Sequence, residues 1–131
     1  MKKTLVLIFI IILAVVIFVD VKPKNKLSYE TTPVQIGSTI INAEIADTQA
    51  KRELGLSGRL ALPADHGMLF VFDQPGRHGF WMKDMNFPID IIWLDENKQI
   101  IGTTKNLQSA SSPQIFYPPQ EIRYALEIKA N

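Results

Sequence analysis

A chain of 131 residues with 47% hydrophobic side chains and no cysteine has room for one folded domain of about one hundred residues. The lack of cysteine excludes disulfides, thiolate metal sites and a thiol nucleophile. From Thr31 onward eleven acidic residues outnumber nine basic ones. A domain that binds nucleic acid would carry a basic stripe, so we expect no nucleic-acid partner.

The N-terminal segment is a predicted membrane anchor. Fifteen consecutive apolar residues run from Leu5 to Val19 behind two lysines, which is typical of an export signal or an anchor. No small-residue cleavage site follows, so we expect the segment to be retained. We predict a single-pass transmembrane helix over residues 1–20, a polar tether over 21–31 and one domain over 32–131 on the extracytoplasmic side of the cell membrane. Cleavage and secretion is the alternative.

The domain is predicted to open with a strand pair and a short helix. Residues 34–36 and 40–46 flank a Gly-Ser turn, and apolar and polar residues alternate in the second of these segments. An Asp-Thr pair then offers an N-cap to residues 49–54, good helix formers that Gly55 interrupts.

Strands are predicted for most of the remaining chain. The apolar stretch 67–72 suits a buried strand, and a turn that contains Pro75 separates it from a short run at 80–82. Residues 89–94 and 99–104 flank a four-residue loop and predict a hairpin. The interval 105–120, rich in Ser, Pro and Gln, predicts a long irregular loop. The alternation over residues 122–128 predicts the last strand.

Several of these segments carry the motifs of one family. The motifs are Ala46–Thr48, Arg52, Gly55-Leu56, Arg59-Leu60, Gly67–Phe72, Phe80–Lys83, Pro88–Asp90, Asp95 and Leu126-Glu127. Over roughly residues 41–129 the chain resembles the prokaryotic family known as domain of unknown function 192, whose members are small and often exported. The resemblance implies no known reaction. Together with the predicted strands it implies a mainly β (α+β) fold, a compact antiparallel β barrel or sandwich with one short helix, preceded by the transmembrane helix.

The family usually has Asn-Thr where this chain has Asp84-Met85, and its members usually continue past the position of Asn131 with a turn and another strand.

A mixed aromatic and charged cluster predicts a binding site. We expect the site to comprise Arg59, Trp81, Lys83, Asp84 and Asp90. Aromatic rings beside polar groups are what sugars, peptides and protein interfaces engage. The leading hypothesis is a membrane-tethered extracytoplasmic binding module for an envelope carbohydrate, an anionic ligand or a protein partner. Packing of Trp81 in the core is the alternative reading of that residue.

Two other functions are compatible with the sequence. Asp84 and Asp90 flank a Pro-containing turn and could form the carboxylate pair of a hydrolase that acts on an envelope polymer. Structural hydrogen bonds are the more common use of such aspartates. A purely structural domain that pairs with a partner through its C-terminal strand, residues 122–131, is the third possibility.

Five side chains are candidate metal ligands: His66, Met68, His78, Met82 and Met85. Imidazole and thioether groups suit copper in an exported protein. Strand spacing, however, places Met82 and Met85 on opposite faces, and Met68 lies inside an apolar segment where core packing is expected. We therefore predict no metal and no cofactor.

Overall fold

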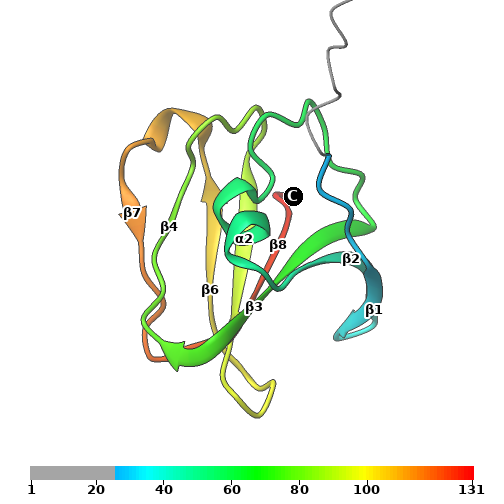
Figure 1. Cartoon of the computed structure of the whole chain (residues 1–131), viewed down its shortest axis with the longest axis vertical. Helices are drawn as coiled ribbons and strands as arrows, with labels where there is room; N and C mark the ends of the chain where they lie inside the picture. The colour runs from blue at the N-terminus through cyan, green and yellow to red at the C-terminus, as the bar shows by residue number, and fades with distance from the viewer. Residues whose placement is uncertain (1–25) are drawn as a thin grey trace, which may run out of the picture.

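The structure, a computed structural model, describes residues 26–131 and arranges them around two β-sheets (Figure 1). The larger sheet contains β1 (Thr31–Ile36), β2 (Thr39–Ala46), β3 (His66–Gly76), β5 (Ile89–Leu94), β6 (Ile100–Leu107) and β8 (Ile122–Lys129). The smaller sheet pairs β4 (Phe80–Trp81) with β7 (Ile115–Phe116). The described helices are α2 (Gln49–Leu54) and the 3-10 turn η1 (Ser109–Ser111).

Neither of these helices is long and apolar enough to cross a membrane. The predicted anchor, residues 1–20, and the first part of the predicted tether lie outside the residues that the structure describes. The strand β1 begins at Thr31, and the backbone carbonyl of Glu30 already accepts a hydrogen bond from the amide of Ile45 at 2.8 Å.

The first three elements form where local sequence signals predict them. Gly37, with φ of +59°, turns β1 into β2, because glycine tolerates this left-handed conformation. Thr48 caps α2 by accepting a hydrogen bond from the amide of Lys51 (3.3 Å) on its side-chain oxygen. Gly55, with φ of +50°, ends the helix. The predicted hairpin and helix are therefore confirmed.

The sheet topology corrects the predicted antiparallel barrel. The strand order is β1-β2-β3-β8-β5-β6, so the sheet is open, with β1 and β6 at its edges. The pair β2 and β3 is parallel, whereas the other neighbours are antiparallel. The reason is the connection through α2: a strand that follows a crossover helix returns in the same direction as the strand before it. The mainly β character and the lone short helix are as predicted.

Two segments are more regular than predicted. β3 continues to Gly76, past the expected turn at Pro75, because its pairing with β8 shifts register between Val71 and Gly76. A proline is tolerated at such an irregularity, since its missing N–H is not needed there. The predicted loop 105–120 contains the end of β6, the turn η1 and β7, which pairs with β4.

The last strand lies in the middle of the sheet. β8 pairs with β3 along one edge and with β5 along the other. Both edges of β8 are therefore paired within the chain, and assembly through residues 122–131 stays a hypothesis that would need a contact other than strand addition to β8. The edges that remain are those of β1 and β6.

The main core lies on the sheet face that α2, β4 and β7 cover (Figure 1). Its largest buried side chain is Trp93 of β5, which is 1% exposed and meets the edge of the Phe80 ring with 5.3 Å between centroids. Trp81, the other tryptophan, is 49% exposed. The alternative reading of Trp81 as a core residue is therefore wrong, because β4 belongs to the covering layer and turns alternate side chains outward.

Candidate functional site

A pocket of about 280 Å³ lies between α2 and β4, over β3 and β8. Its apolar lining consists of Leu54, Gly55, Leu56, Phe70, Phe72, Gly79, Phe80, Trp81 and Met85, and its polar lining of Gln49, Arg52, Glu53, Ser57 and Glu127. Aromatic walls with a few convergent polar groups are typical of small-ligand sites, and this volume is at their small end. The pocket is therefore the candidate functional site.

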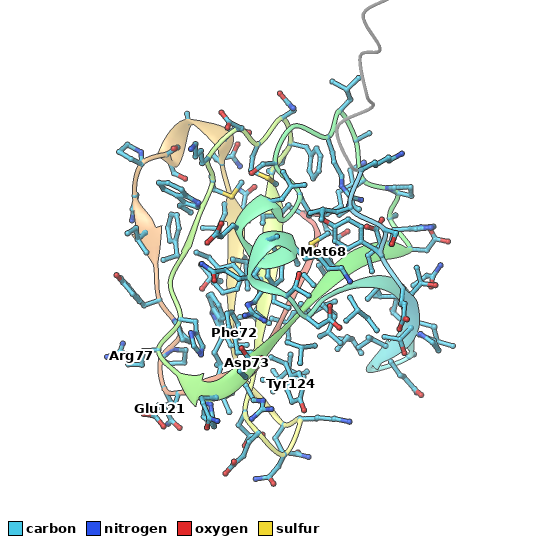
Figure 2. All side chains as sticks on the ribbon, viewed as in Figure 1. Met68, Phe72, Asp73, Arg77, Glu121 and Tyr124 are labelled. Atoms are coloured by element: carbon cyan, nitrogen blue, oxygen red, sulfur yellow. The ribbon has the colours of Figure 1, made fainter. Side chains whose placement is uncertain are left out.

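The sheet supplies the inner wall of this pocket. Phe70 and Phe72 lie two residues apart on β3 and point to the same face. Figure 2 shows Phe72 beside Asp73, farther along β3 than Met68. The Phe80 ring meets Phe70 edge to face, with centroids 4.9 Å apart, so the strands β3 and β4 hold these rings in place.

Glu127 is the unusual residue in the pocket. It lies on β8 directly opposite Met68 of β3 and Ile91 of β5, on the face that α2 covers. It is 5% exposed, and among residues 26–131 its side chain has no hydrogen-bond or ion-pair partner. A charged group is rarely buried without a partner, which marks this carboxyl as a functional candidate.

Burial changes the protonation of Glu127. Desolvation raises the pKa of its carboxyl from 4.5 to about 8, and the positive charge of Arg59 opposes that shift only in part. The carboxyl is therefore mostly protonated and neutral at pH 7, so it can donate a hydrogen bond as well as accept one. Perturbed carboxyls in pockets are typical of binding and catalytic sites.

Arg52 lies at the rim and fixes α2 to the end of β3. Its Nη1 donates to the carbonyl oxygens of Asp47 and Val71, at 2.9 and 2.8 Å, and its Nη2 lies 3.4 Å from a carboxylate oxygen of Asp73. The guanidinium carbon is 5.6 Å from the centroid of the Phe72 ring. Arg52 therefore has a structural role that keeps the outer wall of the pocket in position.

Arg59, the first predicted site residue, lies outside this pocket in a neighbouring depression beside Tyr29. Its two terminal nitrogens donate to the two carboxylate oxygens of Glu44 at 2.7 and 2.6 Å. These hydrogen bonds hold the pKa of Glu44 below its usual value and raise that of Arg59. A guanidinium bound in this bidentate way already has its anion within the protein.

The predicted residues Trp81, Lys83 and Asp84 are brought close to Arg59 by backbone contacts. The amide of Gly58 donates to the carbonyl of Asp84 at 2.8 Å, and the side-chain amide of Asn86 donates to the carbonyl of Arg59 at 2.8 Å. The ammonium of Lys83 lies 5.2 Å from the centroid of the Trp81 ring. Of these residues Trp81 lines the pocket, whereas Lys83 and Asp84 are exposed on the adjoining turn.

Asp90 is separated from the other four. It is 9% exposed, and its carboxylate accepts a hydrogen bond from the backbone amide of Asn106 at 2.7 Å. Asn106 has a φ of +55°, so this bond fixes an unusual backbone conformation in β6. Asp90 therefore has a structural partner, the backbone amide of Asn106.

The two predicted carboxylates should therefore differ in their effect on stability. We expect Asp90→Asn to lower the free energy of unfolding by about 1 to 2 kcal/mol, because a buried charge-assisted hydrogen bond is weakened. Asp84→Asn should change it by less than about 0.5 kcal/mol, because the site is exposed and its φ of +55° suits asparagine. Urea denaturation measures both. Equal losses would show that Asp84 also has a structural role.

The five candidate copper ligands make other contacts in the structure. Met68, Met82 and Met85 belong to the main core cluster. His66 pairs with Asp65 at 2.8 Å, and His78 stacks on Phe72 with the ring centroids 3.8 Å apart. Within residues 26–131 no group of three His, Asp or Glu side chains is placed to hold a metal ion.

The model of domain of unknown function 192, described as an uncharacterized ACR, matches residues 32–131. The chain belongs to this family. The resemblance read from the motifs is thus confirmed. No curated protein matches the chain.

Two solved structures are similar to this member of the family. One is from Sinorhizobium meliloti and is described as a candidate transcription regulator. It is 27% identical to this chain and superposes with a TM-score of 0.74. The match covers 81% of this chain and 85% of the other. The other is a protein of unknown function from Novosphingobium aromaticivorans, which is 25% identical and superposes with a TM-score of 0.72. The match covers 85% of this chain and 80% of the other.

The family motifs now have physical roles. Gly67-to-Phe72 forms β3 and supplies two pocket rings, and Phe80-Trp81 supplies two more from β4. Glu127, part of the Leu126-Glu127 motif, was not among the predicted site residues, because alternation in the last strand placed it on the face opposite the apolar one. One residue indicated that this face is covered. Ala125, two residues earlier on the same face, is of a type that is uncommon in strands.

Proposed function

We propose that this chain is a non-catalytic binding module that takes a small ring or a short side chain into the pocket beside Glu127. The observation that carries the proposal is a buried carboxyl without a protein partner among the described residues, in a pocket that four aromatic rings line. The protein desolvates most of this carboxyl and supplies no hydrogen bond to it, so a ligand in the pocket can provide the partner that the described residues do not.

A carbohydrate is the ligand class that this chemistry favours. Aromatic rings pack against the apolar faces of a sugar, and a carboxyl can donate to one hydroxyl and accept from another. An anion is less suitable, because the terminal nitrogens of Arg59 already bind Glu44 and the pocket contains two acidic side chains, Glu53 and Glu127. A protein partner would have to insert a single side chain into this volume.

A hydrolase is the second candidate, and the same residues support it. Glu127 holds a proton at neutral pH, as a general acid must, and Glu53 provides a second carboxyl in the pocket lining. Asp84 and Asp90, the pair suggested by the sequence, are absent from that lining. Turnover of an envelope glycan by the purified chain, abolished by Glu127→Gln, would replace the binding proposal with this one.

The location forms part of the proposal. The apolar run Leu5–Val19 behind two lysines supports an anchor that leaves the domain outside the cytoplasmic membrane. We expect protease added to intact cells that express the full chain to degrade the domain while a cytoplasmic marker survives. Protection of both until the cells are lysed would place the domain inside.

The binding proposal is tested through the methionine methyl groups. Met85 lines the pocket, whereas Met68 and Met82 are buried in the core outside its lining. In the full-length chain labelled with methyl-13C methionine, monosaccharides and amino sugars of the envelope should shift the Met85 signal and leave the signals of Met68 and Met82 in place. A screen that moves none of these three signals, or moves all three alike, would count against a ligand in this pocket.

The aromatic wall should contribute directly to affinity. Trp81→Ala should weaken the ligand found in that screen about fivefold or more, since a ring at a binding site contributes roughly 1 kcal/mol. Tyr117→Ala is the matched control, because Tyr117 is 55% exposed and lies outside the pocket lining. The two dissociation constants, measured from the Met85 shift, decide the point. Equal effects would show that Trp81 does not contact the ligand.

A further inference from the structure

The electrostatics of the pocket indicate what kind of group Glu127 receives. Ionising a desolvated carboxyl requires a positive charge nearby, and without one the group stays protonated. Among the described residues Glu127 has no such charge in contact with it. The empty pocket therefore holds the neutral carboxyl, and only a positive charge from another protein group or from a ligand would favour its ionised form.

Two protein cations act on Glu127 or line the pocket, and both are already engaged. A third, the ammonium of Lys83, lies 5.2 Å from the centroid of the Trp81 ring and outside the pocket lining. Arg59 acts on Glu127 from a distance, but both of its terminal nitrogens bind Glu44 of β2. Arg52 of α2 lines the pocket, but its terminal nitrogens contact two carbonyls and Asp73. The remaining charged lining residue is Glu53 of α2, and β3 and β4 contribute no charged side chain to the lining. The pocket thus has two carboxyls and no uncommitted cation among its described lining residues.

The aromatic walls favour the same sign of charge. The rings of Phe70, Phe80 and Trp81 line the pocket, and a cation within about 6 Å of the face of such a ring is attracted to its negative π-system. The Phe72 ring is already stacked on His78, with the guanidinium carbon of Arg52 5.6 Å from its centroid. Aromatic rings are the groups by which proteins recognise alkylated ammonium ions. A volume of about 280 Å³ admits one such group with a short ring or chain attached.

We infer that the ligand presents an alkylammonium group to Glu127, so that the ligand supplies the positive charge that this pocket lacks. The inference rests on the proposed binding function and names the chemistry of its ligand. An amino sugar and a quaternary ammonium compound share this chemistry. They differ in whether a ring of hydroxyl groups accompanies the charge.

Binding of a cation is then coupled to release of a proton. Glu127 holds a proton below about pH 8 in the empty pocket, and a cation pairs with its ionised form. The affinity for the cation should fall about tenfold for each pH unit below about 8, because the proton competes with it. A neutral ligand of the same shape binds without displacing the proton, so its affinity should not follow pH in this way.

Choline and 3,3-dimethylbutan-1-ol form a matched pair for the test, because they differ in whether nitrogen or carbon lies at the branched centre. Each is titrated into the full-length chain at pH 6, 7 and 8, and the dissociation constant is taken from the Met85 methyl shift. We expect choline to bind at least tenfold more tightly at pH 8 and to lose this preference by pH 6. Glucosamine and glucose, titrated in parallel, distinguish an amino sugar from a simple ammonium compound.

The variant Glu127→Gln separates the two proposals. It should abolish the preference for choline and its dependence on pH, while the neutral alcohol still binds. Equal binding of choline and the alcohol to the unmodified chain at every pH would overturn the inference but leave a binding pocket. If none of the four compounds shifted Met85, both the inference and the proposed function would be overturned.

Discussion

Replacing Glu127 with glutamine is expected to stabilise the protein by on the order of 3 kcal/mol at pH 7. Glutamine has nearly the shape of the protonated carboxyl that the pocket already holds, and it brings no proton equilibrium with it. The gain arises from the unfolded state. Ionisation of Glu127 at this pH stabilises the unfolded state of the unmodified chain, whereas a glutamine does not ionise. Removing an acidic group from a pocket usually stabilises a fold and harms its function.

The same substitution should change the pH dependence of stability. Because the pKa of Glu127 rises from 4.5 to about 8 on folding, the folded chain binds more protons than the unfolded chain between these values. The free energy of unfolding therefore falls as pH rises through this window, by roughly 1.4 kcal/mol for each unit. Below about pH 4.5 both states are protonated, and above about pH 8 both are ionised, so this contribution levels off.

Urea denaturation of the full-length chain at pH 5, 6, 7 and 8 measures this slope. The variant Glu127→Gln should remove most of it, whereas Glu96→Gln in the exposed hairpin between β5 and β6 should leave it unchanged. A variant as stable as the unmodified chain at every pH would mean that the carboxyl of Glu127 is well solvated. In that case the pocket would not be a low-dielectric site.

Trp93→Ala should cause the largest loss of stability among the substitutions considered, about 3 to 5 kcal/mol. The side chain is 1% exposed, and its Nε1 donates a 2.9 Å hydrogen bond to the hydroxyl of Thr104. Its ring supports Phe80, which lines the pocket, so the cavity left behind should also loosen the inner wall of the site. We expect the Met85 methyl signal to broaden as a result.

Trp81→Ala is the matched control for this loss, because it removes the same side chain from an exposed position. It should lower the free energy of unfolding by less than about 1 kcal/mol. Thermal unfolding of the two variants side by side provides the comparison. Similar losses would mean that β4 is packed into the core more tightly than the structure indicates.

The locally encoded parts of the fold could be predicted from the sequence. The Gly37 turn and the Thr48 cap depend on residues within a few positions of each other, as does the end of α2 at Gly55. The parallel pairing of β2 and β3 could not be found in this way, because it depends on how the chain returns after α2. The position of β8 between β3 and β5 likewise depends on contacts between distant segments.

The candidate site was predictable only in part. Exposed aromatic and charged residues near Trp81 drew attention to the correct segment, and that residue lines the pocket. Glu127 was missed because alternation identifies the two faces of a strand but not what covers each face. Here α2 and β4 cover the face that carries the polar residue, which converts an apparently solvent-facing glutamate into a buried one.

The protonation state of Glu127 is the most direct test of this account. The full-length chain, labelled with 13C at the glutamate carboxyl, can be titrated by NMR with Glu127→Gln as the assignment reference. We expect the Glu127 signal to titrate near pH 8 in the empty pocket and several units lower with saturating choline. A Glu127 signal that titrates near 4.5, with or without choline, would contradict both the desolvated pocket and the ligand proposed to complete it.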